Sequence, residues 1–166
     1  MLVICLNGSV NSGKTTTGQA LATLISGARF IDADDHGAPE GTSFAAMLKI
    51  SMARLEREIA AARAPVLIIA NPLRDEDFAR LHAAASARAA RLVVVTLAPA
   101  LDSVVVDRGA RRLTLDERAR VAEMYREGYH QRAFTDLLIT DAPSPAAAAR
   151  DIVMRLSQMS VTPLFP

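Results

Sequence analysis

Residues 8 to 15 read GSVNSGKT and match the pattern G-x-x-x-x-G-K-[ST]. The two glycines, Gly8 and Gly13, let the backbone curl so that successive N–H groups point at one anion. Lys14 can reach the β- and γ-phosphates of a nucleotide, and the Thr15 hydroxyl can ligate Mg²⁺. A helix beginning near Lys14 directs its positive dipole end at the same anion. We therefore predict a phosphate-binding loop, called the phosphate loop below. Its predicted nucleotide contacts are Gly8, Asn11, Ser12, Gly13, Lys14, Thr15 and Thr16.

The neighbouring sequence has the context that such a loop requires, a strand before it and a helix after it. Residues 2–6 are a short apolar run rich in β-branched side chains, which is typical of a buried parallel strand. Residues 15–25 place apolar side chains at helical spacing, and Gly27 can cap that helix. The alternative is a Gly/Ser turn with a stray lysine. It fits poorly, because the chain has only two lysines and one fills the required position.

Apolar runs alternate with helical stretches along the rest of the chain. We expect strands at 2–6, 29–31, 66–70, 92–97 and 136–140, and further helices at 43–62, 75–90, 102–107, 116–130 and 146–159. This alternation predicts an α/β fold with a five-stranded parallel sheet and helices on both faces. The length predicts a single domain over 1–166, with an irregular tail at 160–166. Ligands of such sheets bind at the carboxyl ends of the strands.

Composition restricts the partners and the compartment. A net charge of +1 argues against a surface that coats nucleic acid. One cysteine excludes an internal disulfide, and no run of eighteen apolar residues or leader-like segment is visible. We therefore expect a soluble cytoplasmic protein, monomeric or homodimeric, without nucleic-acid or membrane partners.

An acidic cluster follows the second predicted strand and contains Asp32, Asp34 and Asp35. One carboxylate there can hold Mg²⁺, and another can accept the proton of an attacking hydroxyl. The alternative is an Asp-rich turn that caps the next helix. We favour Asp32 and Asp34 over Asp35 for these roles.

Basic residues follow the third and fourth predicted strands. Pro72 ends the third strand, and Asp75 is the predicted cap of the next helix. Arg74 has two interpretations, a clamp on an anionic substrate group or a local ion pair with the acidic turn. Arg108 and Arg111 lie in a Gly-containing segment and predict a cationic lid near 108–116 that closes over the triphosphate. The alternative for the lid is a solvated basic turn.

Two further segments are less specific. His130 has a side chain that can act as a general base, but a lone histidine at a helix end more often caps the helix or lies at the surface. Asp141 and Pro143, after the last predicted strand, can cup the adenine of a nucleotide, although a plain strand-to-helix turn explains them almost as well.

Taken together, these motifs resemble the small P-loop kinases: shikimate kinases, gluconate kinases, adenylylsulfate kinases and the chloramphenicol phosphotransferase. Residues 30–34, FIDAD, are similar to the F-x-D-x-D of shikimate and gluconate kinases. There the first Asp assists Mg²⁺ and the second contacts the acceptor hydroxyl, which implies these roles for Asp32 and Asp34. The resemblance also implies a P-loop NTPase fold like that of the nucleoside-monophosphate kinases.

The later segments resemble different members of the group. Residues 71–77 are similar to the S-P-[FY]-R-x-x-R-D stretch of adenylylsulfate kinases, which implies that Arg74 binds substrate. Asp77 occupies the second basic position of that stretch. Residues 108–111 resemble the lid, and 134–141 resemble the final strand and adenine loop. No triple-glycine segment follows the third strand, and His36-Gly37 replaces the histidine-proline of gluconate kinases, so the resemblance names no acceptor.

The sequence hypothesis is an ATP- and Mg²⁺-dependent phosphotransferase acting on a hydroxyl of a small polar molecule, such as a sugar acid, a cyclitol, adenylylsulfate or an antibiotic. The expected catalytic residues are Lys14, Asp34, Arg108 and Arg111; substrate contacts are Asp34 and Arg74; metal contacts are Thr15 and Asp32; the remaining nucleotide contacts are Arg111, Asp141 and Pro143. Two alternatives stay open. One is a regulatory ATPase with no acceptor, and the other is a nucleoside or nucleotide kinase, for which only Phe44 and Phe78 offer aromatic stacking near the expected pocket.

Overall fold

The computed structural model describes residues 1–107, 112–140 and 142–159. Within them a five-stranded sheet, parallel throughout, has the order β2-β3-β1-β4-β5. The strands are β1 (Leu2–Asn7), β2 (Ala28–Asp32), β3 (Val66–Ala70), β4 (Arg91–Leu97) and β5 (Leu137–Ile139). The predicted α/β fold is therefore confirmed, and each predicted strand agrees with the structure to within one residue at either end.

The central strand β1 is buried along its whole length, and this explains its continuous apolar sequence. Cys5 lies opposite Ile69 of β3 and Val94 of β4. Because β1 lies between β3 and β4, the loop that follows it sits at the middle of the carboxyl edge of the sheet. The phosphate loop is thus flanked by the ends of both neighbouring strands.

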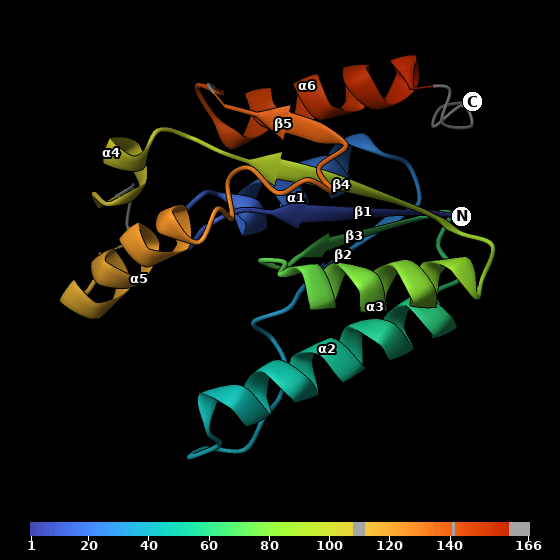
Figure 1. The fold of residues 1–166 in the computed structure, drawn as a ribbon. Helices are drawn as coiled ribbons and strands as arrows, with labels where there is room; N and C mark the ends of the chain where they lie inside the picture. Colours follow the sequence, from blue (N-terminus) through green and yellow to red (C-terminus); the bar gives the residue numbers. More distant parts are fainter. Residues whose placement is uncertain (108–111, 141, 160–166) are drawn as a thin grey trace.

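Helices cover both faces of the sheet (Figure 1). On one face lie α1 (Lys14–Leu24) and α6 (Pro145–Gln158), where Leu21 and Ile152 join a buried apolar cluster. On the other lie α2 (Phe44–Ala61) and α3 (Asp75–Ser86), where Leu55 and Leu81 join a second cluster. The short α4 (Leu101–Val104) and α5 (Leu115–Arg126) lie beyond the carboxyl edge (Figure 1).

Three predicted helices are shorter in the structure than expected. The segment predicted at 116–130 ends at Arg126, because Gly128 adopts φ +77 and Tyr129 N–H donates to the Met124 carbonyl in a Schellman motif. The helix predicted at 75–90 ends at Ser86. Ala89, just beyond its end, adopts φ +50, a left-handed conformation that is usually occupied by glycine. The helix predicted at 102–107 is a single turn, Leu101–Val104.

The start of α3 also differs from the prediction. Arg74, rather than Asp75, is the residue that caps the helix. The carboxylate of Asp77 accepts a hydrogen bond from the Arg74 backbone N–H, at 3.1 Å, as the third residue of a capping box does.

Among the helices of the described part of the chain, none is long and apolar enough to cross a membrane.

Candidate active site

The phosphate loop joins the end of β1 to the start of α1. Gly8 and Gly13 both have positive φ, +139° and +94°. A Cβ atom at Gly8 would lie 2.5 Å from the Leu97 carbonyl oxygen and 2.8 Å from Ser12 Oγ, so no larger residue fits there. Both glycines are therefore required by the backbone, as the sequence predicted.

The N-terminus of α1 differs from those of its neighbours. Ser43, Thr114 and Ser144 cap α2, α5 and α6 with side-chain oxygens, whereas α1 has no side-chain cap and no acidic residue in its first turn. Its first N–H groups, which lack intrahelical partners, are thus directed at the loop. The Lys14 ammonium donates to the carbonyls of Gly8 (3.2 Å) and Ser9 (2.7 Å) across the same loop. The loop gathers positive charge where a phosphate would bind.

Thr15 and Asp32 meet beside the phosphate loop. The Thr15 hydroxyl donates to Asp32 Oδ2 at 2.6 Å, and the Asp34 backbone N–H donates to Asp32 Oδ1 at 3.1 Å. Hydroxyl and carboxylate oxygens are the ligands that Mg²⁺ prefers. The two residues predicted for metal binding thus come together from α1 and β2, and their chemistry fits Mg²⁺.

A cavity of about 460 Å³ covers this region. Lys14, Thr15, Asp32 and Asp34 are among its lining residues. A second cavity, of about 810 Å³, lies against it and is called the acceptor cavity below. Val10, Asp34 and Pro72 line both cavities, so the two spaces adjoin at the exposed Asp34 carboxylate. The acceptor cavity is lined by Val10, Ala33, Asp34, His36, Phe44, Met47, Leu48, Ser51, Asn71, Pro72, Arg74, Asp77, Arg120, Glu123, Met124, Glu127, Tyr129 and Arg132.

Arg74 lines the acceptor cavity and is also held by its own helix. Its guanidinium contacts Asp77 Oδ2 at 3.0 Å and Glu76 Oε1 at 2.7 Å. The hydrogen bond that the Arg74 side chain donates to Asp77 is the main reason why the pKa of Arg74 is raised. The local ion pair is therefore present, and Arg74 also lines the acceptor cavity; its role as a clamp on the substrate stays a prediction.

Asn7 is a positioning residue that sequence reasoning missed. Its fully buried amide donates to Thr96 Oγ1 and to the Tyr129 carbonyl, both at 3.0 Å, and accepts from Leu73 N–H at 2.9 Å. One side chain thus ties the end of β1 to the loop after β3 and to the segment after α5. The available signal was a polar residue closing an apolar strand directly before Gly8.

The segment after α5 supplies a second missed group, Tyr129 and Arg132. The Arg132 guanidinium lies over the Tyr129 ring, with Cζ 4.7 Å from the centroid, and Arg120 lies at 6.0 Å from the same ring. Burial is the main cause of the raised pKa of Tyr129. His130 instead stacks on Tyr125, with centroids 4.7 Å apart, and is not among the residues lining the two cavities.

The lid and the adenine loop are described only at their borders. Arg108, Arg111 and Asp141, like the tail 160–166, lie outside the described residues. Asp107 accepts from Leu113 N–H at 2.9 Å and contacts Arg118 at 2.8 Å, so it fixes one border of the predicted lid segment to the other. The Leu113 hydrogen bond is the main cause of the lowered pKa of Asp107. Pro143 is exposed and lines a cavity of about 310 Å³ between β5 and α6.

Comparison with known proteins adds to this geometry. No protein-family model matches the chain, and no curated protein matches it significantly. Among solved structures, a gluconokinase from Sinorhizobium meliloti 1021 superposes with a TM-score of 0.75 at 19% identity, covering 96% of this chain and 93% of the other. The chain has the fold of the small P-loop kinases.

Other members of that group superpose over the same length. A shikimate kinase from Aquifex aeolicus vf5 gives a TM-score of 0.66 at 18% identity, over 96% of this chain and 99% of the other. An APS kinase from Mycobacterium tuberculosis, solved with AMPPNP and APS, gives 0.63 at 17% identity, over 94% and 97%. These three structural neighbours belong to families that the sequence motifs resemble, and at these identities the likeness establishes the fold.

Proposed function

We propose that this protein transfers the γ-phosphoryl group of ATP to a hydroxyl group of a small molecule. The observation that carries the proposal is the meeting of two cavities at Asp34, one lined by the phosphate loop and the other large enough for an acceptor. A group-transfer enzyme needs donor and acceptor sites that adjoin in this way, because its rate depends on positioning the reacting atoms. The fold shared with small P-loop kinases supports the same activity.

On the nucleotide side, backbone N–H groups from Ser12 to Thr15 would cradle the β-phosphate. Lys14 would exchange its contacts with the Gly8 and Ser9 carbonyls for oxygens of the β- and γ-phosphates. Thr15 and Asp32 would hold Mg²⁺, which would neutralise charge on the phosphate oxygens. Pro143, together with Asp141, would contact the adenine.

On the acceptor side, Asp34 would accept a hydrogen bond from the attacking hydroxyl and remove its proton as transfer proceeds. Arg74, which also lines the cavity, would contact the acceptor. Arg108 and Arg111 would close over the triphosphate and stabilise the charge that develops on the transferred group. Asp34 and Arg74 follow the ends of β2 and β3, at the carboxyl edge where parallel sheets bind their ligands.

The acceptor cavity weighs against the regulatory-ATPase alternative, because a protein that only hydrolyses ATP needs no second cavity of about 810 Å³ next to the phosphate site. The nucleoside-kinase alternative keeps one of its two aromatic candidates, because Phe44 lines the acceptor cavity and is exposed. Phe78 stacks on Phe134 with centroids 4.6 Å apart and is therefore engaged in packing.

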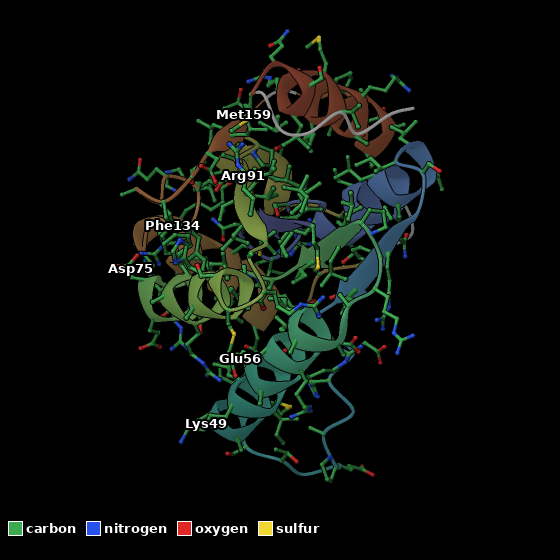
Figure 2. The ribbon with its side chains drawn as sticks, turned by 90° about the vertical axis from the view of Figure 1, so that its right-hand side faces the viewer. Lys49, Glu56, Asp75, Arg91, Phe134 and Met159 are labelled. Atoms are coloured by element: carbon green, nitrogen blue, oxygen red, sulfur yellow. The ribbon has the colours of Figure 1, made fainter. Side chains whose placement is uncertain are left out.

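The test is Mg²⁺-dependent ADP release from ATP, measured with and without pools of hydroxylated acceptors. We expect one pool to raise the rate, and Lys14→Ala to lower that rate at least a hundredfold with an unchanged far-UV CD spectrum. The matched control is Lys49→Ala, which removes the other lysine of the chain from the exposed surface of α2 (Figure 2) and should leave the rate unchanged. Near-normal turnover in Lys14→Ala would contradict the proposal.

A further inference from the structure

Arg74 lines the acceptor cavity, but acids of its own helix already occupy its guanidinium. Its Nε donates to Asp77 Oδ2 at 3.0 Å and its Nη2 to Asp77 Oδ1 at 3.3 Å, while its Nη1 contacts Glu76 Oε1 at 2.7 Å. An arginine recognises a carboxylate or a phosphate through two parallel N–H donors. Asp77 therefore takes the pair of donors that an anionic acceptor would need.

The Asp77 carboxylate is fixed in this position by the backbone as well. Its Oδ2 also accepts from the Arg74 backbone N–H at 3.1 Å, and its side chain is only 11% exposed. An incoming carboxylate that displaced it would leave two like charges side by side where little water can screen them. Glu76 is 66% exposed and is screened far more. Asp77 thus decides which charge Arg74 presents to the cavity.

The α5 side of the cavity repeats this arrangement. Arg120 contacts both Glu123 and Glu127, so one guanidinium again meets two carboxylates. Among the described residues, four carboxylates and three arginines line the cavity, and Glu76 adds a fifth carboxylate beside it. The third arginine, Arg132, lies over the Tyr129 ring and does not offset this excess. The surroundings of the cavity are therefore net negative, which disfavours an acid and favours a cation.

The α2 side of the cavity is apolar and aromatic. Phe44, Met47 and Leu48 line it from the first turns of the helix, and Phe44 is 65% exposed. These residues share one face, because helical residues three and four apart are neighbours. An exposed ring packs against hydrocarbon and also attracts an ammonium group to its face. The volume of about 810 Å³ lies within the range of pockets that enclose drug-sized ligands.

We propose that Asp77 is a specificity-determining residue that cancels the charge of Arg74 and directs the acceptor cavity toward amphipathic amino alcohols, an inference that rests on the proposed function. The acceptor hydroxyl meets Asp34, its apolar body lies against Phe44 and Leu48, and its ammonium group is attracted by the acidic lining. Arg74 contacts the acceptor as a neutralised hydrogen-bond donor. Hydroxy acids of the same size are disfavoured, because their carboxylate meets the surplus negative charge.

Three naphthalene probes with the same body test this preference independently of phosphoryl transfer. At neutral pH 2-(1-naphthyl)ethylamine is a cation, 2-(1-naphthyl)ethanol is uncharged and 1-naphthylacetate is an anion, and naphthalene fluorescence reports the binding of each. We expect the wild type to bind the amine about fivefold more tightly than the acid, with the alcohol between them. Asp77→Asn should lower the Kd of the acid about fivefold, raise that of the amine about threefold and leave that of the alcohol unchanged.

Asparagine suits this test because it removes the charge and keeps an oxygen that can accept from the Arg74 backbone N–H. A damaged fold would weaken all three probes, whereas a freed Arg74 strengthens the binding of one. Gained affinity for the acid is therefore the diagnostic result. Glu76→Gln, at an exposed position, should lower the Kd of the acid in the same direction by about twofold.

Glu56→Gln is the matched control. It makes the same carboxylate-to-amide change in a pair with Arg80 that also has two hydrogen bonds, and neither residue is among those lining the cavity. All three Kd values should stay at the wild-type level. Unchanged binding of the acid in Asp77→Asn, an equal change for all three probes, or an equal gain in Glu56→Gln would overturn the inference. A wild type that binds the acid as tightly as the amine would overturn it too.

The failure of this inference and that of the proposed function are distinguishable. Lys14→Ala should abolish ATP turnover and leave the binding of the three probes unchanged. If hydroxy acids raise ADP release more than amino alcohols with the same apolar body, the kinase proposal stands and this inference fails. If the probes behave as expected and no acceptor raises ADP release, the proposed function fails and the charge preference of the cavity stands.

Discussion

Replacing Asn7 with alanine should destabilise the fold more than any surface change, because three hydrogen bonds converge on one buried amide. The side chain joins Thr96, Leu73 and Tyr129 at 2.9 to 3.0 Å and has no solvent exposure. A hydrogen bond contributes about 1 kcal/mol net, and a buried group left unpaired costs about 1–3 kcal/mol. In Asn7→Ala, Thr96 keeps its contact with Thr135, whereas Leu73 N–H and the Tyr129 carbonyl lose the Asn7 side chain as their hydrogen-bond partner. We therefore expect a loss of about 3–5 kcal/mol in the free energy of unfolding.

Urea unfolding followed by circular dichroism measures this loss. Thr96→Val is a graded control of similar shape that removes one of the three Asn7 contacts together with the Thr96–Thr135 hydrogen bond, and it should cost about 1–2 kcal/mol. A loss under about 1 kcal/mol in Asn7→Ala, or one no larger than that of Thr96→Val, would refute the argument. If the variant stays folded, its KM for the acceptor should rise, because Asn7 holds the Leu73 backbone next to Arg74.

Three further predictions concern other parts of the molecule. Asp32→Asn should raise the Mg²⁺ concentration needed for half-maximal ADP release about tenfold or more, since it removes the charged partner of Thr15; an unchanged Mg²⁺ dependence would argue against the metal role. Cys5 should not react with Ellman's reagent at pH 8 in the folded protein and should react fully in urea, because burial raises its pKa to about 12. The pKa of Cys5 in the folded protein lies above its ordinary value of 9.0. Burying the neutral thiol therefore stabilises the fold fully below pH 9, and this contribution is lost as the pH rises toward 12. Glu56→Gln should cost less than about 1 kcal/mol, because the pair with Arg80 is partly exposed. The hydrogen bond from Arg80 lowers the pKa of Glu56, so the loss should appear above about pH 4.5 and vanish in more acidic buffer; a pH-independent loss would contradict that cause.

Much of the fold follows from local sequence. Continuous apolar runs gave the strands, and the β-α alternation gave the parallel sheet. The phosphate loop could be placed because its glycines, Lys14 and Thr15 have fixed physical roles at fixed spacing. The rule that functional groups gather at the carboxyl edge placed Asp32 near the phosphate loop, and in the structure the Thr15 hydroxyl donates to Asp32 at 2.6 Å; the shared metal role stays a prediction.

The sequence could not predict features that depend on tertiary contacts. The end of α3 depends on Ala89 in a left-handed conformation, and alanine gives no sign of this in a sequence. The contacts of Asn7 and the stacking of Arg132 on Tyr129 join residues distant in the chain, which periodicity cannot reveal. The sequence expectation of a small polar acceptor stays a prediction, but composition does not tell where the apolar residues of the chain gather. Phe44, Met47 and Leu48 line the acceptor cavity from the start of α2, whose later turns pack on the sheet.

The transfer of ³²P from γ-labelled ATP to an isolated acceptor tests the central claim most directly. Acceptors would be drawn from aromatic and alicyclic amino alcohols, with hydroxy acids, sugar acids and nucleosides in parallel. Label should appear as a phosphate monoester of one acceptor with the wild type and with Lys49→Ala, and be lost with Lys14→Ala and Asp34→Asn. Label found only as inorganic phosphate across all acceptors, at a rate that none of them raises, would contradict phosphoryl transfer and favour a regulatory ATPase.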